Sequence, residues 1–488
     1  VVRIARRLAG RPRIRVRFTP RCDNGEGKPD ITFGSHHIRA ANPSYPMRLT
    51  TDAPVTHVIE SNAFLLLDSY TFILGPDETL QGSPASSGAH MLEETERYWH
   101  RWVRNLAVPF EWQDAVIRAA ITLKLNTYDD TGGIIAAMTT SIPEAPGTTR
   151  NWDYRHCWLR DAYFVVNALN RLGVTGSLEG YLRYIEEILA AEGAAHLQPV
   201  YGVSGVRDLT EQIAPGLAGY LGLGPVRVGN QAYEQLQHDV YGSVVLGASH
   251  AFFDRRIVRR ADQVLFRQLE ELGQRAFLSY AVPDSGLWEF RGRREVHTFS
   301  AAMCWAACDR LRRIAQHLGD ADRAEFWRSR AEAIHRDICE RAFVPEIQAF
   351  ASAFDGRSLD ASVLMLSEIG FLPAGDPRMR STVEAIEQHL RRGDFVLRYD
   401  REDDFGIPST AFIVCTFWLI QALALQGDHR RAREQFEKLL ACRNRLGLLS
   451  EDIDINTGEL WGNFPQTYSM VGIIMCAMRL SSRWDEAF

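Results

Sequence analysis

Two glutamates far apart in the sequence, Glu289 and Glu451, are of a type and in surroundings that could do chemistry. Glu289 follows Trp288 and Glu451 follows Ser450, each among aromatic or apolar residues at the edge of a helix-like segment. Inverting glycoside hydrolysis needs two such carboxyl groups, one neutral to protonate the leaving oxygen and one ionised to activate a water on the opposite face of the sugar. An apolar wall such as Trp288 raises the pKa of the acid by desolvation.

Spacing alone leaves both positions open to a plainer interpretation. Glu289 could be a surface residue of a loop, and the sequence does not decide which of Glu451, Asp452 and Asp454 points inward. Pairs of carboxylates whose surroundings separate their pKa values are nevertheless typical of acid–base sites.

A second group of residues could grip a sugar. Arg160 and Asp161 fall in the first turn of a predicted helix, close to Trp158. An Arg/Asp pair can hydrogen-bond vicinal hydroxyls, and an indole can cover the apolar face of a sugar ring. A buried ion pair that braces the start of the helix is the alternative.

Two further clusters are ambiguous. Gln237 and Asp239 lie at helical spacing in an apolar segment, which indicates either a ligand site or a buried polar network. Arg398 precedes the acidic pair Asp403 and Asp404, where a solvated charged loop is the alternative. The acidic cluster lacks the spacing of a calcium loop, and we expect no metal ion and no cofactor.

The bulk properties exclude several classes of protein. The 488 residues carry a net charge of −6, with basic residues scattered, so we expect no nucleic-acid partner. No apolar run reaches the roughly 20 residues that span a bilayer, and the first residues lack the apolar core of a signal peptide. The eight cysteines lie mostly in apolar stretches, which favours reduced thiols and a cytoplasmic protein.

The periodicity of the chain changes near residue 84. Residues 1–84 alternate polar and apolar side chains, and we expect a β domain there. Residues 85–108 predict a linker helix, and residues 109–488 predict a mainly α domain of successive helices with long loops. The absence of a tetratricopeptide or armadillo period favours a closed toroid of helical hairpins over a solenoid.

Taken together, these segments resemble glycoside hydrolase family 15, the group of glucoamylases, glucodextranases and family-15 trehalases. The resemblance runs from about residue 90 to the end. It rests on TTSIPE (139–144), NWDYR (151–155), WLRD (158–161), PVRVGN (225–230), LWE (287–289), LSE (449–451) and GNFPQ (462–466). It implies an (α/α)6 toroid, preceded by the remainder of an N-terminal β-sandwich whose front is missing.

The resemblance also implies roles for individual residues. Glu289 takes the general-acid position and Glu451 the general-base position of an inverting, exo-acting α-glucosidase. The positions that match substrate-binding residues are Trp158, Arg160, Asp161, Gln237, Asp239, Trp288 and Arg398. Phe290 stands where many glucoamylases carry a second acid, and residues 403–410 also depart from the family pattern, so we expect both to shape the side that receives the leaving group.

The substrate therefore stays open among trehalose, isomaltose and maltodextrin. An inverting disaccharide phosphorylase on the same toroid would keep the acid but would need no general base. A non-catalytic sugar-binding toroid is a third alternative, which two intact glutamates disfavour. The expected partner is a small carbohydrate, and the sequence leaves a homo-oligomer open.

Overall fold

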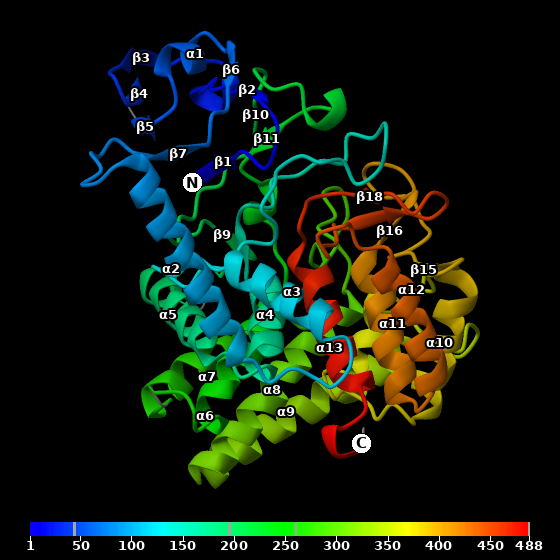
Figure 1. Ribbon diagram of the computed structural model, residues 1–488. Helices are drawn as coiled ribbons and strands as arrows, with labels where there is room; N and C mark the ends of the chain where they lie inside the picture. Colours follow the sequence, from blue (N-terminus) through cyan, green and yellow to red (C-terminus); the bar gives the residue numbers. More distant parts are fainter. Residues whose placement is uncertain (42–44, 194–196, 259–260, 487–488) are drawn as a thin grey trace. The chain divides into compact units, whose positions relative to one another are not determined.

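The computed structural model describes residues 1–41, 45–193, 197–258 and 261–486 (Figure 1). Its contacts divide the chain into two compact units. The first comprises residues 1–105 with Ala214–Leu217, and the second comprises residues 106–213 and 218–488. The helix predicted over residues 85–108 is α2 (Pro84–Arg104), which packs on β7 (Ser69–Pro76) within the first unit.

The first unit is built on a five-stranded antiparallel sheet in the order β1-β7-β5-β4-β3, as Figure 1 shows. The other strands of this sheet are β1 (Val2–Arg6), β5 (Met47–Thr51), β4 (His37–Ala41) and β3 (Asp30–Phe33). A second, two-stranded ribbon joins β2 (Arg13–Arg15) to β6 (Ala63–Leu65), and a short helix, α1 (Val55–Ile59), packs on β4. One apolar core contains residues of both sheets, including Ile38, Leu49 and Phe64.

The second unit is a closed ring of helices. An inner ring forms because each member packs on the next and the last, α13, packs on the first, α4. Its members in order are α4 (Leu159–Arg171), α6 (Asp239–Phe253), α8 (Thr298–Leu318), the 3-10 helix η5 (Ala361–Leu366), α11 (Ile413–Leu425) and α13 (Thr467–Leu480). The ring confirms the predicted toroid.

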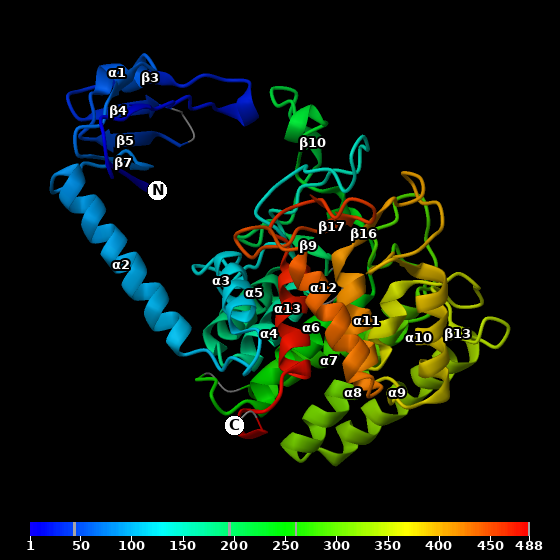
Figure 2. The ribbon, with the colours of Figure 1, turned by 45° about the vertical axis from the view of Figure 1, so that its right-hand side comes forward.

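An outer layer alternates with the inner ring along the chain. Its helices are α3 (Gln113–Leu125), α5 (Thr175–Glu192), α7 (Gln263–Ser279), α9 (Ala321–Arg341), α10 (Pro377–Leu390) and α12 (His429–Ala441). Each packs on the inner helices beside it, and Figure 2 shows α12 beside α11 and α13. Helices and their partners thus form six hairpins, the (α/α)6 arrangement.

The inner and outer helices differ in how their apolar residues are distributed. In α11, every residue from Ile413 to Ala424 is buried, whereas in α12 only one face is buried, through residues such as Ala432, Phe436 and Leu439. A helix that is apolar on all sides must be enclosed, and an amphipathic helix can cover it. The loops at one end of the ring contain short strands. Three of them form one sheet: β16 (Thr410–Phe412), β17 (Asp452–Asp454) and β18 (Leu460–Trp461).

Within the described residues, no helix combines the length and the apolar composition that a membrane crossing requires. All eight cysteines are described and free, and five of them are buried.

Candidate active site

A cavity opens where the loops before the inner helices meet. It has a volume of about 850 Å³, including the open solvent at its mouth. Arg160 and Asp161 come from the first turn of α4, whereas Glu289, Arg398 and Glu451 precede α8, α11 and α13. The closed ring therefore gathers at one place residues that lie up to 291 positions apart in sequence.

Arg160 lines this cavity with only 6% of its side chain exposed, and we call the region around it the deep end. Its Nη1 donates to Gln237 Oε1 (2.8 Å) and Asp239 Oδ2 (3.0 Å), and its Nη2 donates to the carbonyl oxygen of Leu287 (3.1 Å). The guanidinium is thereby fixed in place before any ligand binds.

Asp161 is the free acceptor beside it. Its side chain lines the cavity and accepts no hydrogen bond from the side chain of another described residue. Burial raises the pKa of this carboxyl to about 7, although the charge of Arg160 opposes the shift. A buried carboxyl without a protein partner is suited to receive the hydroxyls of a sugar.

Gln237 and Asp239 lie next to Arg160 in the interior. Both are buried but neither lines the cavity, and both instead accept hydrogen bonds from Arg160. Gln237 also donates to Gln235 Oε1 (3.0 Å) and to Glu289 Oε1 (3.3 Å). They form the buried polar network that was one of the two alternatives, and they position the groups in front of them; a role in substrate binding stays a prediction.

Glu289 lies in a tight turn and faces the cavity. Its backbone adopts φ = 62°, the left-handed region that non-glycine residues rarely occupy. Its Oε1 accepts from Trp158 Nε1 (2.5 Å) and lies 3.6 Å from Arg160 Nη2. Burial raises the pKa of Glu289, and the Arg160 charge and the Trp158 hydrogen bond oppose that rise. These contacts exclude the surface-loop interpretation.

Trp288 borders the cavity as part of its wall. Its Nε1 donates to Asp360 Oδ2 (2.7 Å), and its ring packs on Tyr399, Phe412 and Trp418. The indole that touches the Glu289 carboxyl is therefore Trp158, which sequence reasoning had assigned only to the sugar.

Glu451 lies across the same cavity and is only 1% exposed. Its Oε1 accepts from the Tyr154 hydroxyl (2.7 Å) and its Oε2 from the backbone N–H of Asn463 (3.2 Å). Burial, reinforced by the negative charges of Glu144 and Asp452, raises the pKa of Glu451 well above its usual value.

The structure also selects among the three acids of this segment. Glu451 lines the cavity, whereas Asp452 is paired within the sheet of β17 and accepts from Thr410 Oγ1 (2.9 Å). Asp454 accepts from the backbone N–H groups of Asn456 and Thr457 in a turn. The pairing of β17 with its neighbours decides the inward residue, and sequence spacing could not.

One short segment holds both glutamates. Tyr154 bonds Glu451, Trp158 bonds Glu289, and the two rings pack against each other with centroids 5.3 Å apart. Residues four positions apart thus fix two carboxyl groups that are 162 positions apart.

Glu144 is a site residue that sequence reasoning missed. It is buried, lines the cavity and accepts from Arg398 Nη2 (2.5 Å) and Trp152 Nε1 (2.9 Å). Arg398 therefore lines the cavity as predicted, but as half of an ion pair. The available signal was the position of Glu144 within the TTSIPE segment that carries the resemblance.

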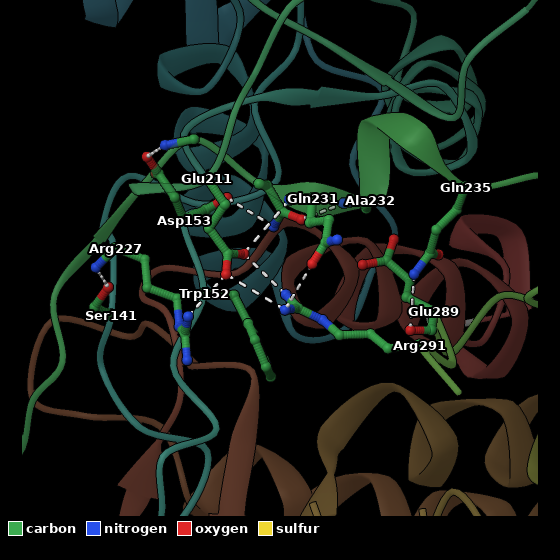
Figure 3. A network of polar contacts seen from close by, with 12 residues as sticks. Ser141, Trp152, Asp153, Glu211, Arg227, Gln231, Ala232, Gln235, Glu289 and Arg291 are labelled. Atoms are coloured by element: carbon green, nitrogen blue, oxygen red, sulfur yellow. Dashed lines mark hydrogen bonds and ion pairs between the residues drawn. The ribbon is translucent and has the colours of Figure 1, made fainter. Parts of the chain in front are cut away.

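A second network surrounds Trp152 (Figure 3). The guanidinium groups of Arg227 and Arg291 lie 5.1 Å and 4.5 Å from its ring, and both donate to Glu211, at 2.7 Å and 2.8 Å. Trp152 and Arg291 line the cavity, and Arg227 and Glu211 stand behind them. Nearby, Asp404 accepts from the backbone N–H groups of Arg291 and Gly292 (2.7 Å each), which ties the acidic loop to the turn of Glu289.

Phe290 borders the cavity, but its side chain is only 3% exposed. Its ring stacks on His297 (5.8 Å between centroids) and packs on Tyr399 (5.5 Å). Phe290 therefore lines the cavity while its ring also packs on its neighbours, and its effect on the leaving-group side stays a prediction.

Among the described residues, no three His, Cys, Asp or Glu side chains come together in an arrangement that could hold a metal ion.

Comparison with known proteins identifies the family to which the chain belongs. The profile of Glycosyl hydrolases family 15 matches residues 112–478. The chain is 36% identical over 406 residues to a trehalase of Mycobacterium tuberculosis, an alignment that covers 82% of this chain and 59% of the relative. It is likewise 36% identical over 399 residues to a trehalase of Thermoplasma acidophilum, covering 81% of this chain and 67% of the relative.

Solved structures agree on the fold. A bacterial glucoamylase complexed with acarbose superposes with a TM-score of 0.66 at 14% identity, over 91% of this chain and 73% of that one. A glucoamylase from Saccharomycopsis fibuligera gives 0.56 at 13% identity, over 75% and 93%. The chain spans about three fifths of the length of the mycobacterial trehalases that it matches.

Proposed function

Because the chain belongs to glycosyl hydrolase family 15, we propose that it hydrolyses an α-linked glucoside with inversion, acting on a terminal glucose. The observation that supports this most strongly is the pair Glu289 and Glu451, held in one cavity by the single segment 154–158. Trehalose is the proposed substrate, because the relatives at 36% identity are trehalases.

In the proposed reaction, Arg160 and Asp161 hold the terminal glucose at the deep end. Glu289 donates its proton to the glycosidic oxygen as the bond from C1 to that oxygen breaks. Glu451 removes a proton from a water that attacks C1 from the opposite face. The new C1–OH bond is β, and the leaving sugar departs with the proton of Glu289.

The raised pKa of Glu451 has a mechanistic consequence. A carboxylate with high proton affinity is a stronger general base, but it must be ionised when substrate binds. The Tyr154 hydroxyl and the Asn463 N–H stabilise that ionised form.

A substrate panel tests the proposal. Trehalose, kojibiose, nigerose, maltose, isomaltose and maltodextrin are incubated with the protein, with and without phosphate, and released glucose is measured. We expect phosphate-independent turnover that is fastest on trehalose. Strictly phosphate-dependent turnover that yields a glucose phosphate would instead support the phosphorylase, and tight binding without turnover would support a sugar-binding protein.

The anomer of the product tests inversion. Hydrolysis of trehalose gives one β-glucose by inversion and one α-glucose as the leaving sugar, so an α-glucoside with a non-sugar leaving group is needed. With α-glucosyl fluoride, NMR should show β-glucose first. Initial α-glucose would contradict the inverting mechanism. We further propose that the protein works in the cytoplasm, which suits its buried free thiols.

A further inference from the structure

Arg291 presents a charged group on the outer side of the catalytic cavity. It lies two residues beyond Glu289, lines the cavity and has 27% of its side chain exposed. Glu289 is 22% exposed and Arg160, at the deep end, only 6%. The exposed fraction of the side chain therefore increases from Arg160 to Glu289 to Arg291.

The guanidinium of Arg291 is held in place from three sides. Its Nη2 donates to Glu211 Oε2 (2.8 Å), its Nη1 donates to Gln231 Oε1 (3.2 Å), and its plane lies over the Trp152 ring (Figure 3). Its charge and that of Arg227 lower the pKa of Glu211, although burial of Glu211 opposes them, and the anchor therefore stays ionised. A fixed donor binds a hydroxyl without first losing side-chain freedom.

Donors remain available for a ligand. A guanidinium carries five N–H groups, and in the described part of the chain the hydrogen bonds of Arg291 run from Nη1 and Nη2 to two residues. The Nε–H is left without a described acceptor. Trp152 and Phe405 line the cavity beside it and supply apolar ring faces.

The direction of departure follows from the proposed function, on which this inference rests. Arg160 is more enclosed than Glu289, so a leaving sugar that takes its proton from Glu289 would lie on the more exposed side of that residue. We propose that Arg291 is a specificity-determining residue that binds hydroxyls of the leaving sugar, against the ring faces of Trp152 and Phe405. It would favour substrates whose leaving group is a sugar over those whose leaving group carries no hydroxyl.

Arg227 offers a matched control. Its guanidinium contacts the same indole, at 5.1 Å, and the same Glu211, at 2.7 Å, yet it does not line the cavity. If Arg291 acts only by bracing Trp152 and Glu211, then loss of Arg227 should have a similar effect. If Arg291 contacts the leaving sugar, the two variants should differ.

The experiment measures kcat/KM of the wild type, Arg291→Ala, Arg291→Lys and Arg227→Ala on three substrates. Trehalose presents a leaving sugar and needs the acid. Phenyl α-glucoside needs the acid, but its leaving group carries no sugar hydroxyls. The leaving group of α-glucosyl fluoride carries no hydroxyls and departs without help from the acid. Arg291→Ala should lower kcat/KM on trehalose by about 10- to 100-fold, the range for hydrogen bonds to a charged group, with changes below about threefold on the other two.

Arg227→Ala should leave the ratios among the three substrates unchanged, and Arg291→Lys should lie between the wild type and Arg291→Ala because it keeps the charge without the planar fork. Equal losses on all three substrates would overturn the proposal, since they would indicate a bracing role. Equal losses on trehalose and phenyl α-glucoside, with none on α-glucosyl fluoride, would also overturn it. They would show that Arg291 acts through the acid Glu289 rather than on the leaving sugar. Arg291→Lys decides the matter if Arg291→Ala does not fold. A wild type that hydrolyses none of the three would defeat the proposed function itself.

Discussion

Glu289 and Glu451 face one cavity from surroundings of opposite charge. Glu289 has the cation Arg160 at 3.6 Å and a partly exposed side chain. Glu451 is almost fully enclosed, and the anions Glu144 and Asp452 raise its pKa further. The residue proposed as the acid thus has a cation beside it, and the residue proposed as the base has other acidic side chains beside it.

This contrast shows that burial alone does not assign the two roles. Burial raises the pKa of both carboxyl groups, and neighbouring charges then moderate the rise at Glu289 and increase it at Glu451. The proposed assignment depends instead on position: Glu289 is more exposed than Arg160, and we propose that the leaving group lies on this more exposed side. The variants below test this comparison.

The largest effect is expected from removal of either carboxylate. Glu289→Gln and Glu451→Gln should each lower kcat on trehalose by at least roughly 10²-fold, because acid or base catalysis typically contributes ~10²–10⁴. On α-glucosyl fluoride the two should diverge. Fluoride leaves without a proton, so Glu289→Gln should recover much of its activity while Glu451→Gln should not.

Asp454→Asn, a change in the turn that follows the base, is the control and should turn over trehalose like the wild type. Near-normal turnover by Glu451→Gln would mean that another group activates the water, and the reverse pattern on fluoride would exchange the two roles.

The next effect concerns the deep end of the cavity. Arg160→Lys and Asp161→Asn should each weaken transition-state binding by about 2–4 kcal/mol, because lysine cannot reproduce the planar fork and an amide is a weaker acceptor. Every substrate presents the same terminal glucose, so kcat/KM should fall alike across the whole substrate panel. A loss confined to one disaccharide would place these residues outside the terminal-glucose site.

Phe290→Glu should act on stability more than on specificity. Its ring is enclosed by His297 and Tyr399, so a carboxyl there is buried without a designed partner. The free energy of unfolding at neutral pH should fall by at least about 2 kcal/mol, measured by denaturant titration. Phe290→Leu, which keeps an apolar side chain, should lose less. Unchanged stability of Phe290→Glu would show that this side chain can turn into the cavity.

The smallest effects are shifts of the pH profile of kcat/KM, whose acidic limb reports ionisation of Glu451 and whose alkaline limb reports proton loss from Glu289. Glu144→Gln removes a charge that raises the pKa of Glu451, so the acidic limb should move to lower pH. Trp158→Phe removes a donor to ionised Glu289, so the alkaline limb should move to higher pH.

Trp288→Ala admits water beside Glu289 and should move the alkaline limb in the opposite direction, to lower pH. If the acidic limb of the Glu144 variant and the alkaline limb of the Trp158 variant stay at their wild-type pH, then these neighbours do not set the pKa values of Glu451 and Glu289.

The sequence predicted the toroid from its successive helical segments, which show no solenoid period, and from its family resemblance. The enclosed α11, apolar on all sides, and its amphipathic outer partner α12 agree with that prediction. It predicted Glu289, Glu451, Arg160 and Asp161 as cavity residues, and the structure brings them together. Their roles in catalysis remain predictions.

Other parts of the site could not be predicted, because they depend on contacts between distant segments. Asp239 supports Arg160 from the first residue of α6 and Gln237 from the loop just before it, and that pairing exists only once the ring closes. Glu144 gains its place through Arg398, 254 positions away. Phe290 follows the acid in sequence, yet its neighbours His297 and Tyr399 determine that its ring is enclosed.

The left-handed backbone at Glu289 means that the side chain proposed for catalysis occupies a conformation that lowers the stability of the fold. A non-glycine residue in this conformation costs roughly 1–2 kcal/mol, and glycine adopts it freely, although glycine also loses more chain entropy on folding. Replacing Glu289 by glycine would also remove a carboxyl whose ionisation is disfavoured by burial. A library selected for heat tolerance alone would therefore tend to enrich inactive variants at this position, and any attempt to evolve a sturdier enzyme from this chain has to screen for turnover at the same time.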